Sequence, residues 1–348
     1  MHKHGGIDAE PLQPTFLRKL ADPSIQTVLL CGCGGGFDFV HSLTLYSELQ
    51  RLGKTVVVGS YSFGDPNKIT NAERVFDDSG VIVKRVTSES NPDEHYGPEV
   101  HLCSFLDKRF HACGPHFVYA YYARDFTVPL LTRLYRQFIE THAIDAIVLF
   151  DGGSDSLMSG DEEGLGDPIE DAVSVATVAS LSQLKARILV SIGLGTDRFN
   201  HVSDFSSLRA IAELTKMGGF LGAISLEPSS HGSRLYLDCL EHVFQRQGFR
   251  SVLAGTIASA IEGHFGLDEV PPALQHRVRP GQLFLWPLMA ILWGFDVETV
   301  ARRSMLTTWI RECQTVSECY DAIATGRREI GTHIRGVENF PRHEEMRG

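Results

Sequence analysis

The chain has 348 residues, of which 43% are hydrophobic and 22% are charged, a composition typical of a folded protein with one large α/β domain or one domain plus a helical addition. Its formal net charge of -11 argues against a nucleic-acid-binding protein, because a phosphate backbone is bound by clustered Lys and Arg. The seven cysteines show no C-x-x-C spacing, so the sequence indicates reduced thiols rather than a zinc or redox site.

Neither a signal peptide nor a membrane span is expected. The first residues are polar and contain no apolar core. The longest apolar run, Leu283–Leu292, contains Pro287 and is too short to cross a bilayer. We therefore expect a cytoplasmic protein with a small-molecule substrate and without nucleic-acid or membrane partners. A homo-oligomer is compatible with these features.

The first predicted elements are a strand, a glycine loop, a helix and a second strand. Thr27–Cys31 is a short apolar run that leads into Gly32–Gly36. Phe39–Leu52 has apolar residues at helical spacing, and Lys54–Tyr61 is a second β-rich run. This order is the building unit of doubly wound sheets. We predict a Rossmann-like α/β fold with a mostly parallel sheet, helices on both faces and a helical C-terminal part.

Further strand-like runs follow, with helical patterns between most of them. They are Val81–Val86, Ala146–Phe150, Ile188–Ile192 and Phe220–Leu226. The last three lead into Asp151–Asp155, Gly193–Asp197 and Glu227–Pro228 respectively. Ligands bind at the carboxyl ends of the strands in open α/β sheets, so we expect these loops to meet at one edge.

The sequence from about Gly232 onward is mostly helical. The predicted helices are Leu235–Arg246, Ser251–Glu262, Leu283–Leu292, Val297–Ile310 and Val316–Arg327. We accordingly divide the chain into an N-terminal extension (1–22), a Rossmann-like core (23–230), a mostly helical C-terminal part packed on the core (231–335) and a tail (336–348).

The glycine loop is a candidate binding site for an anion. Glycines let the backbone approach a ligand closely and leave amides free at the start of a helix. The loop does not match the dinucleotide fingerprint well, because Phe37 stands where the last glycine is expected. A tight turn without a ligand is the alternative. The candidate cofactor-binding residues here are Gly32, Gly34, Gly35 and Gly36.

Asp38 follows the loop directly and has two equally weighted interpretations. A carboxylate at a helix start commonly caps that helix. Among free amides it could also bind a ribose hydroxyl, a metal ion or a substrate amine, and we include it with the cofactor-binding candidates.

The segment from Asp151 to Asp171 contains eight carboxylates interspersed with glycines. Such a charge run is usually a solvated loop. This one starts directly after an apolar strand, and its mixture of acids and small residues suits hard cations or sugar hydroxyls. We predict Asp155 and Asp161 as catalytic residues, the same two with Glu162 as metal ligands, and Gly152 and Gly153 as cofactor-binding residues.

Asp197, at the next strand end, is a third catalytic candidate. His201 and His231 also lie in loops, but a single histidine is more often a surface or structural residue than a catalyst. The sequence contains no Gly-x-Ser-x-Gly elbow, His-Glu-x-x-His helix or Walker loop. A serine hydrolase, a zinc protease and a P-loop nucleotidase are therefore disfavoured.

These motifs resemble the family known as domain of unknown function 1152. The resemblance is carried by Gly34–Asp38, Asp151–Asp155 and Gly160–Leu165, with Pro168 and Asp171. It implies a Rossmann-like fold and a shared site, without implying a reaction.

The residues favour an enzyme, a hydrolase or transferase acting on a phosphorylated or ribosyl-containing metabolite. The glycine loop would hold an anionic group, the acidic segment would bind Mg²⁺ or hydroxyls, and one carboxylate would act as general base. Mg²⁺, a nucleotide and NAD are the cofactors compatible with these motifs. The alternatives are an NAD(P)-binding Rossmann-type enzyme and a non-catalytic nucleotide-binding sensor.

Overall fold

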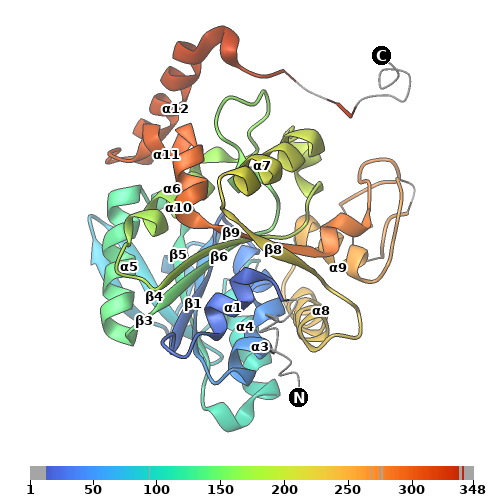
Figure 1. Cartoon of the computed structure of the whole chain (residues 1–348). Helices are drawn as coiled ribbons and strands as arrows, with labels where there is room; N and C mark the ends of the chain where they lie inside the picture. The colour runs from blue at the N-terminus through green and yellow to red at the C-terminus, as the bar shows by residue number, and fades with distance from the viewer. Residues whose placement is uncertain are drawn as a thin grey trace, which may run out of the picture.

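A single sheet organises the part of the chain that the structure, a computed structural model, describes: residues 13–93, 95–267, 269–272, 274–275, 277–336 and 339–340. In these residues nine strands are ordered β3-β4-β5-β2-β1-β6-β7-β9-β8 (Figure 1). The strands are β1 Thr27–Gly32, β2 Thr55–Ser62, β3 Glu73–Asp78, β4 Val81–Thr87, β5 Phe117–Tyr122, β6 Ala146–Asp151, β7 Ala186–Ser191, β8 Phe220–Ser225 and β9 Ile291–Asp296.

Helices surround this sheet. They are α1 Thr15–Ala21, α2 Asp38–His41, α3 Leu43–Arg51, α4 Pro98–Arg109, α5 Val128–His142, α6 Pro168–Ser180, α7 Asp204–Lys216, α8 His231–Phe244, α9 Val252–Ile261, α10 Val297–Arg303, α11 Met305–Ile310 and α12 Val316–Ile330. In the described part of the chain no helix is long and apolar enough to cross a membrane.

The centre of the sheet is parallel. Strands β5, β2, β1, β6 and β7 pair in parallel with one another, so that Leu29 of β1 lies opposite both Val57 of β2 and Ile147 of β6. The strands β4 and β9 run antiparallel to their neighbours. The predicted α/β class with a mostly parallel sheet is confirmed.

Both faces of the sheet are covered. Leu29 and Cys31 belong to a core shared with α5, α6, α10 and α11, whereas Val28 and Leu30 belong to a core shared with α1, α3, α4 and α8. Figure 1 shows these two groups of helices on opposite sides of the sheet. Burial on both faces explains why the central strands are continuous apolar runs rather than alternating ones.

The predicted helix over Leu283–Leu292 is wrong. This segment holds a short 3₁₀ turn, Pro287–Ala290, and the start of β9. Pro287 prevents a continuous helix, and the run that follows is rich in the branched and aromatic residues that favour strands. As a result the C-terminal part contributes a strand that lies between β7 and β8.

Other predicted elements are correct in type but differ in extent. The helix expected over Phe39–Leu52 is divided at Ser42, and the one over Val297–Ile310 is divided at Ser304. The strands β3 and β5 were not predicted. The proposed domain boundaries stay a prediction, and most of residues 1–22 and 336–348 lies outside the described residues.

Candidate functional site

A cavity of about 640 Å³ opens at the carboxyl ends of the parallel strands. The loops after β1, β2, β5, β6 and β7 border it, together with the start of α9. Seven carboxylates of the described residues line it. They are Asp38, Asp151, Asp155, Asp167, Glu170, Asp171 and Asp197. Loops from separate strands therefore meet at one edge, as a doubly wound sheet requires.

Asp38 links the two glycine-containing loops. Its Oδ2 accepts a hydrogen bond from the backbone N–H of Gly34 at 2.9 Å, and its Oδ1 accepts one from the N–H of Gly152 at 3.1 Å. Burial and the nearby charge of Asp155 raise the pKa of Asp38 to about 8, although the two amides act in the opposite direction. Amides expected to hold an anionic ligand are thus partly used by a carboxylate of the protein.

Three buried carboxylates converge beside these amides. Asp151 ends β6, Asp171 lies in the first turn of α6, and each places an oxygen within 4.8 Å of the other and of an oxygen of Asp38. Among the described residues none of the three forms an ion pair with Lys or Arg. Three carboxylates without a counter-charge form an arrangement that suits a hard cation.

The hydrogen bonds of this trio are incomplete. Asp151 Oδ2 accepts a hydrogen bond from the hydroxyl of Ser156. Asp171 Oδ1 is buried and accepts none from any described residue. Burial, followed by repulsion from Asp155, holds the pKa of Asp151 and of Asp171 well above the usual range. A buried acceptor without a partner requires an explanation, and beside two other carboxylates a bound cation is one that fits.

Asp155 and Asp197 extend the acidic floor of the cavity. Asp155 Oδ2 accepts a hydrogen bond from the N–H of Asp167 at 3.0 Å, and Asp197 Oδ2 accepts one from the N–H of Ser154 at 2.6 Å. Burial raises the pKa of Asp155 to about 6, and burial followed by the charge of Asp155 holds the pKa of Asp197 well above its usual range. Two of the three predicted catalytic residues, Asp155 and Asp197, therefore line the cavity, and Asp161 does not.

The glycines make room for these acidic side chains. A Cβ at Gly34 would lie 2.9 Å from Asp171 Oδ1, and one at Gly153 would lie 2.2 Å from Asp197 Oδ2. A Cβ at Gly152 would meet Asp38 Oδ1 at 2.7 Å. The groups that lie close to these glycines belong to the protein, and the predicted approach of a ligand to them stays a prediction.

The remaining loop glycines serve other purposes. Gly32 ends β1 and does not line the cavity. Gly36 has a positive φ of 84°, which an L side chain rarely adopts. Gly35 lies under the ring of Phe63, whose Cε1 would be 2.1 Å from a Cβ at that position. Phe63 thus covers the outer surface of the glycine loop.

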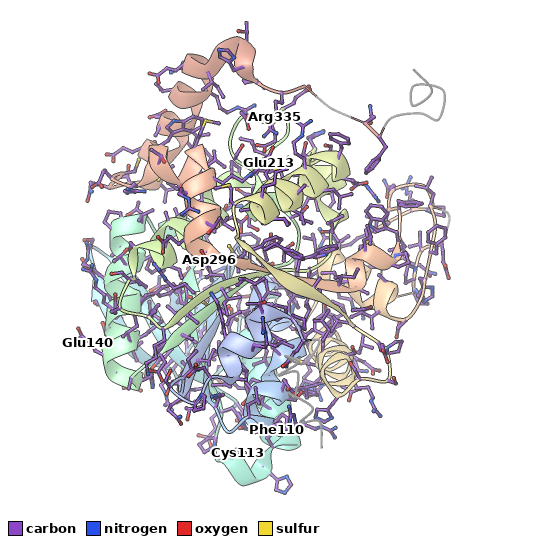
Figure 2. The ribbon with its side chains drawn as sticks, in the orientation of Figure 1. Phe110, Cys113, Glu140, Glu213, Asp296 and Arg335 are labelled. Atoms are coloured by element: carbon purple, nitrogen blue, oxygen red, sulfur yellow. The ribbon has the colours of Figure 1, made fainter. Side chains whose placement is uncertain are left out.

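Asp161 and Glu162 lie away from the cavity. Arg335 Nη2 is 2.5 Å from Asp161 Oδ1 and 2.8 Å from Glu162 Oε1, and Glu162 Oε2 also accepts a hydrogen bond from the N–H of Gly160 at 2.9 Å. Figure 2 labels Arg335 close to Glu213 of α7, and Arg335 Nη1 lies 3.7 Å from Glu213 Oε1. The structure thus separates Asp155 from the two other residues predicted to share a metal with it.

Sequence reasoning missed His41, Asp151 and Asp171 as site residues. His41 Nδ1 lies 3.0 Å from the hydroxyl of Tyr236, and burial lowers the pKa of His41 to about 3, so its ring is neutral. Asp171 carried a usable signal, because it lies one turn into the helix that follows the acidic loop. His41 carried none, and the two histidines named from the sequence, His201 and His231, do not line the cavity.

The comparisons with known proteins identify a family but no reaction. The model of the family described as "Protein of unknown function (DUF1152)" matches residues 126–330, which is more than half of the chain. No curated protein and no solved structure matches it. The matched range contains Asp151, Asp155, Asp171 and Asp197, whereas Asp38 precedes it. The chain belongs to the family of proteins of unknown function DUF1152.

Proposed function

We propose that this protein is a divalent-cation-dependent enzyme, a hydrolase or transferase that acts on a ribosyl-containing or phosphorylated metabolite. The cation would be held by Asp38, Asp151 and Asp171. The observation that carries the proposal is the convergence of three buried carboxylates, an oxygen of each lying within 4.8 Å of the others, together with an Asp171 Oδ1 that has no hydrogen-bond partner among the described residues.

Electrostatics support a cation at this place. Burying several like charges is unfavourable, so the carboxylates must either take up protons or share a positive ion. Carboxylate oxygens are the ligands preferred by Mg²⁺ and Ca²⁺. Such an ion would polarise an oxygen of the ligand or lower the pKa of a bound water.

Asp155 and Asp197 can act on the ligand without being ligands of the cation. Asp155 and Asp197 line the same cavity and would accept hydrogen bonds from ligand hydroxyls. One of them, for which we favour Asp155, would take the proton that a water or hydroxyl loses when it attacks. These assignments retain two of the predicted catalytic residues and leave out Asp161 and Glu162.

A bare phosphate at the glycine loop is disfavoured. The N–H groups of Gly34 and Gly152 already bind Asp38, and the ring of Phe63 covers Gly35. A pyrophosphate there would also face several carboxylates. These observations argue against the NAD(P)-binding alternative. A phosphate group would be accommodated better near an arginine at the cavity mouth.

Cation binding to chelator-treated protein tests the proposal. We expect Mg²⁺, Mn²⁺ or Ca²⁺ at saturating concentration to raise the melting temperature, because a ligand at about 100 times its Kd stabilises the native state by about 2.7 kcal/mol. Asp171→Asn should abolish the increase. Asp145→Asn is the matched control, since Asp145 immediately precedes β6, at the end of that strand opposite to Asp151.

Two results would contradict the proposal. One is the absence of a cation effect in the wild-type protein, and the other is an unchanged effect in Asp171→Asn. Product formation from ribosyl and phosphorylated compounds, followed by mass spectrometry, separates an enzyme from a sensor. Asp155→Asn should then retain the cation effect and lose turnover, whereas a sensor binds a ligand without forming any product.

A further inference from the structure

The mouth of the cavity carries three partly exposed phenylalanines. Phe63 follows β2, Phe199 lies in the 3₁₀ turn Thr196–Asn200 after β7, and Phe249 precedes α9. These residues are 44%, 48% and 40% exposed respectively. Large apolar side chains scattered singly over a surface need no explanation, but three on separate loops around one concavity mark a binding surface.

The protein fixes two of these rings and leaves part of each free. The ring of Phe63 lies against the backbone of Gly35, and the guanidinium carbon of Arg124 is 5.5 Å from its centroid. The guanidinium carbon of Arg277 is 5.0 Å from the centroid of Phe249. These contacts cover part of each ring face, and the apolar surface that each ring leaves exposed is held at little entropic cost, which suits contact with a planar ligand.

The floor and the mouth of the cavity therefore differ in chemistry. The floor consists of buried carboxylates that accept hydrogen bonds and attract cations, while the mouth offers aromatic surface and two arginines. Asn200 lies next to Phe199 at the cavity, and a carboxamide of this kind can bind the edge of a nucleobase. The cavity volume of about 640 Å³ falls within the usual range for small-molecule sites.

We infer that the ligand is a nucleoside or nucleotide whose base packs against Phe63 and Phe249 at the mouth while its ribose hydroxyls reach the carboxylate floor. The inference rests on the proposed function, because the ribose is placed by the same acidic cluster. A simple sugar would leave the aromatic rim unused, and an aromatic compound without hydroxyls would leave the carboxylates unpaired. A docked protein segment is disfavoured because the rings surround a concavity rather than a flat face.

Titration calorimetry of the full-length protein with adenosine, guanosine, adenosine monophosphate and free ribose, each with Mg²⁺ and with EDTA, tests this inference. We expect nucleosides to bind at least tenfold more tightly than ribose. Phe63→Leu and Phe249→Leu keep apolar bulk but remove the aromatic face, and each should weaken nucleoside binding about tenfold. Phe265→Leu is the matched control, since Phe265 is 62% exposed and does not line the cavity.

The outcomes separate this inference from the proposed function. Nucleosides that bind no more tightly than ribose, or Kd values unchanged in both cavity variants, would overturn the inference even if Mg²⁺ still raised the melting temperature. Conversely, nucleoside binding that persists in EDTA and depends on Phe63, in a protein without a cation effect, would support the inference and reject the cation site. Tighter binding of adenosine monophosphate than of adenosine would identify a nucleotide, with its phosphate near Arg124 or Arg277.

Discussion

Replacing Asp171 by Asn should stabilise the cation-free protein. Two unit charges 4.8 Å apart repel each other by about 3.5 kcal/mol at an effective dielectric constant of about 20. Asp171 has two such neighbours, Asp38 and Asp151. Partial protonation relieves some of this repulsion, so we expect a net gain of about 2 kcal/mol in unfolding free energy and an increase of about 3 °C in melting temperature.

The gain should depend on pH in a defined direction. The pKa of Asp171 is raised in the folded protein. The pKa of Asp155 is raised to about 6 and that of Asp38 to about 8. These carboxylates therefore contribute most to the stability of the wild-type protein below about pH 4, the pKa of a carboxyl in the unfolded chain. Their contribution is lost as the pH rises through 6 to 8. The difference between Asp171→Asn and wild type should widen over that range.

Calorimetric unfolding in EDTA at several pH values between 4 and 8 provides the measurement. The expected pattern is an Asn variant that is more stable than wild type at pH 8, nearly equal to it at pH 4, and insensitive to Mg²⁺. An Asn variant that is less stable than wild type at every pH would show that Asp171 is a structural acceptor. The electrostatic argument for the cation site would then fail.

Three further changes test other parts of the structure. Gly152→Ala should destabilise the protein by about 1–3 kcal/mol in urea unfolding, because its Cβ would overlap buried side chains, whereas Gly248→Ala, with no atom within 4 Å, should not. Burial lowers the pKa of His41 in the folded protein to about 3, so its contribution to the unfolding free energy falls by about 1.4 kcal/mol for each pH unit below 6.5. His41→Gln should reduce this dependence of stability on pH. Asp161→Asn loses its contact with Arg335, which should cost at most about 1 kcal/mol, and should leave the Mg²⁺ effect intact. If Asp161→Asn abolished the effect of Mg²⁺ on the melting temperature, the cation would be assigned instead to the ligands predicted from sequence, which include Asp161.

The sequence was sufficient to predict the fold class because most of the local signals agree with the global arrangement. Apolar runs such as Thr27–Cys31, followed by glycine and then by helical spacing, have few structural interpretations. The run that includes β9 was misinterpreted because a short apolar segment has no clear period. Its pairing partners, β7 and β8, lie far away in the sequence, so no local pattern could reveal it.

The site was only partly predictable for a related reason. The predicted metal ligands Asp155, Asp161 and Glu162 are close in sequence, but the chain turns at Gly160, where φ is 109°. Beyond this turn, Asp161 and Glu162 form ion pairs with Arg335 outside the cavity. Asp38 and Asp171 are more than a hundred residues apart and meet only because α6 begins beside the glycine loop. Convergence of this kind depends on the packing of whole elements, which the pattern of residue types does not encode.

The position of β9 makes completion of the sheet depend on a late part of the chain. Until about residue 296 has been synthesised, the edge of β7 remains unpaired and β8 has no neighbour in the sheet. An unpaired apolar edge readily pairs with other chains. A fragment that ends near residue 230 would keep every carboxylate of the floor and still expose this edge. Expression of the nominal core alone would therefore be expected to yield aggregates, and nascent chains would need shielding until β9 reaches the sheet.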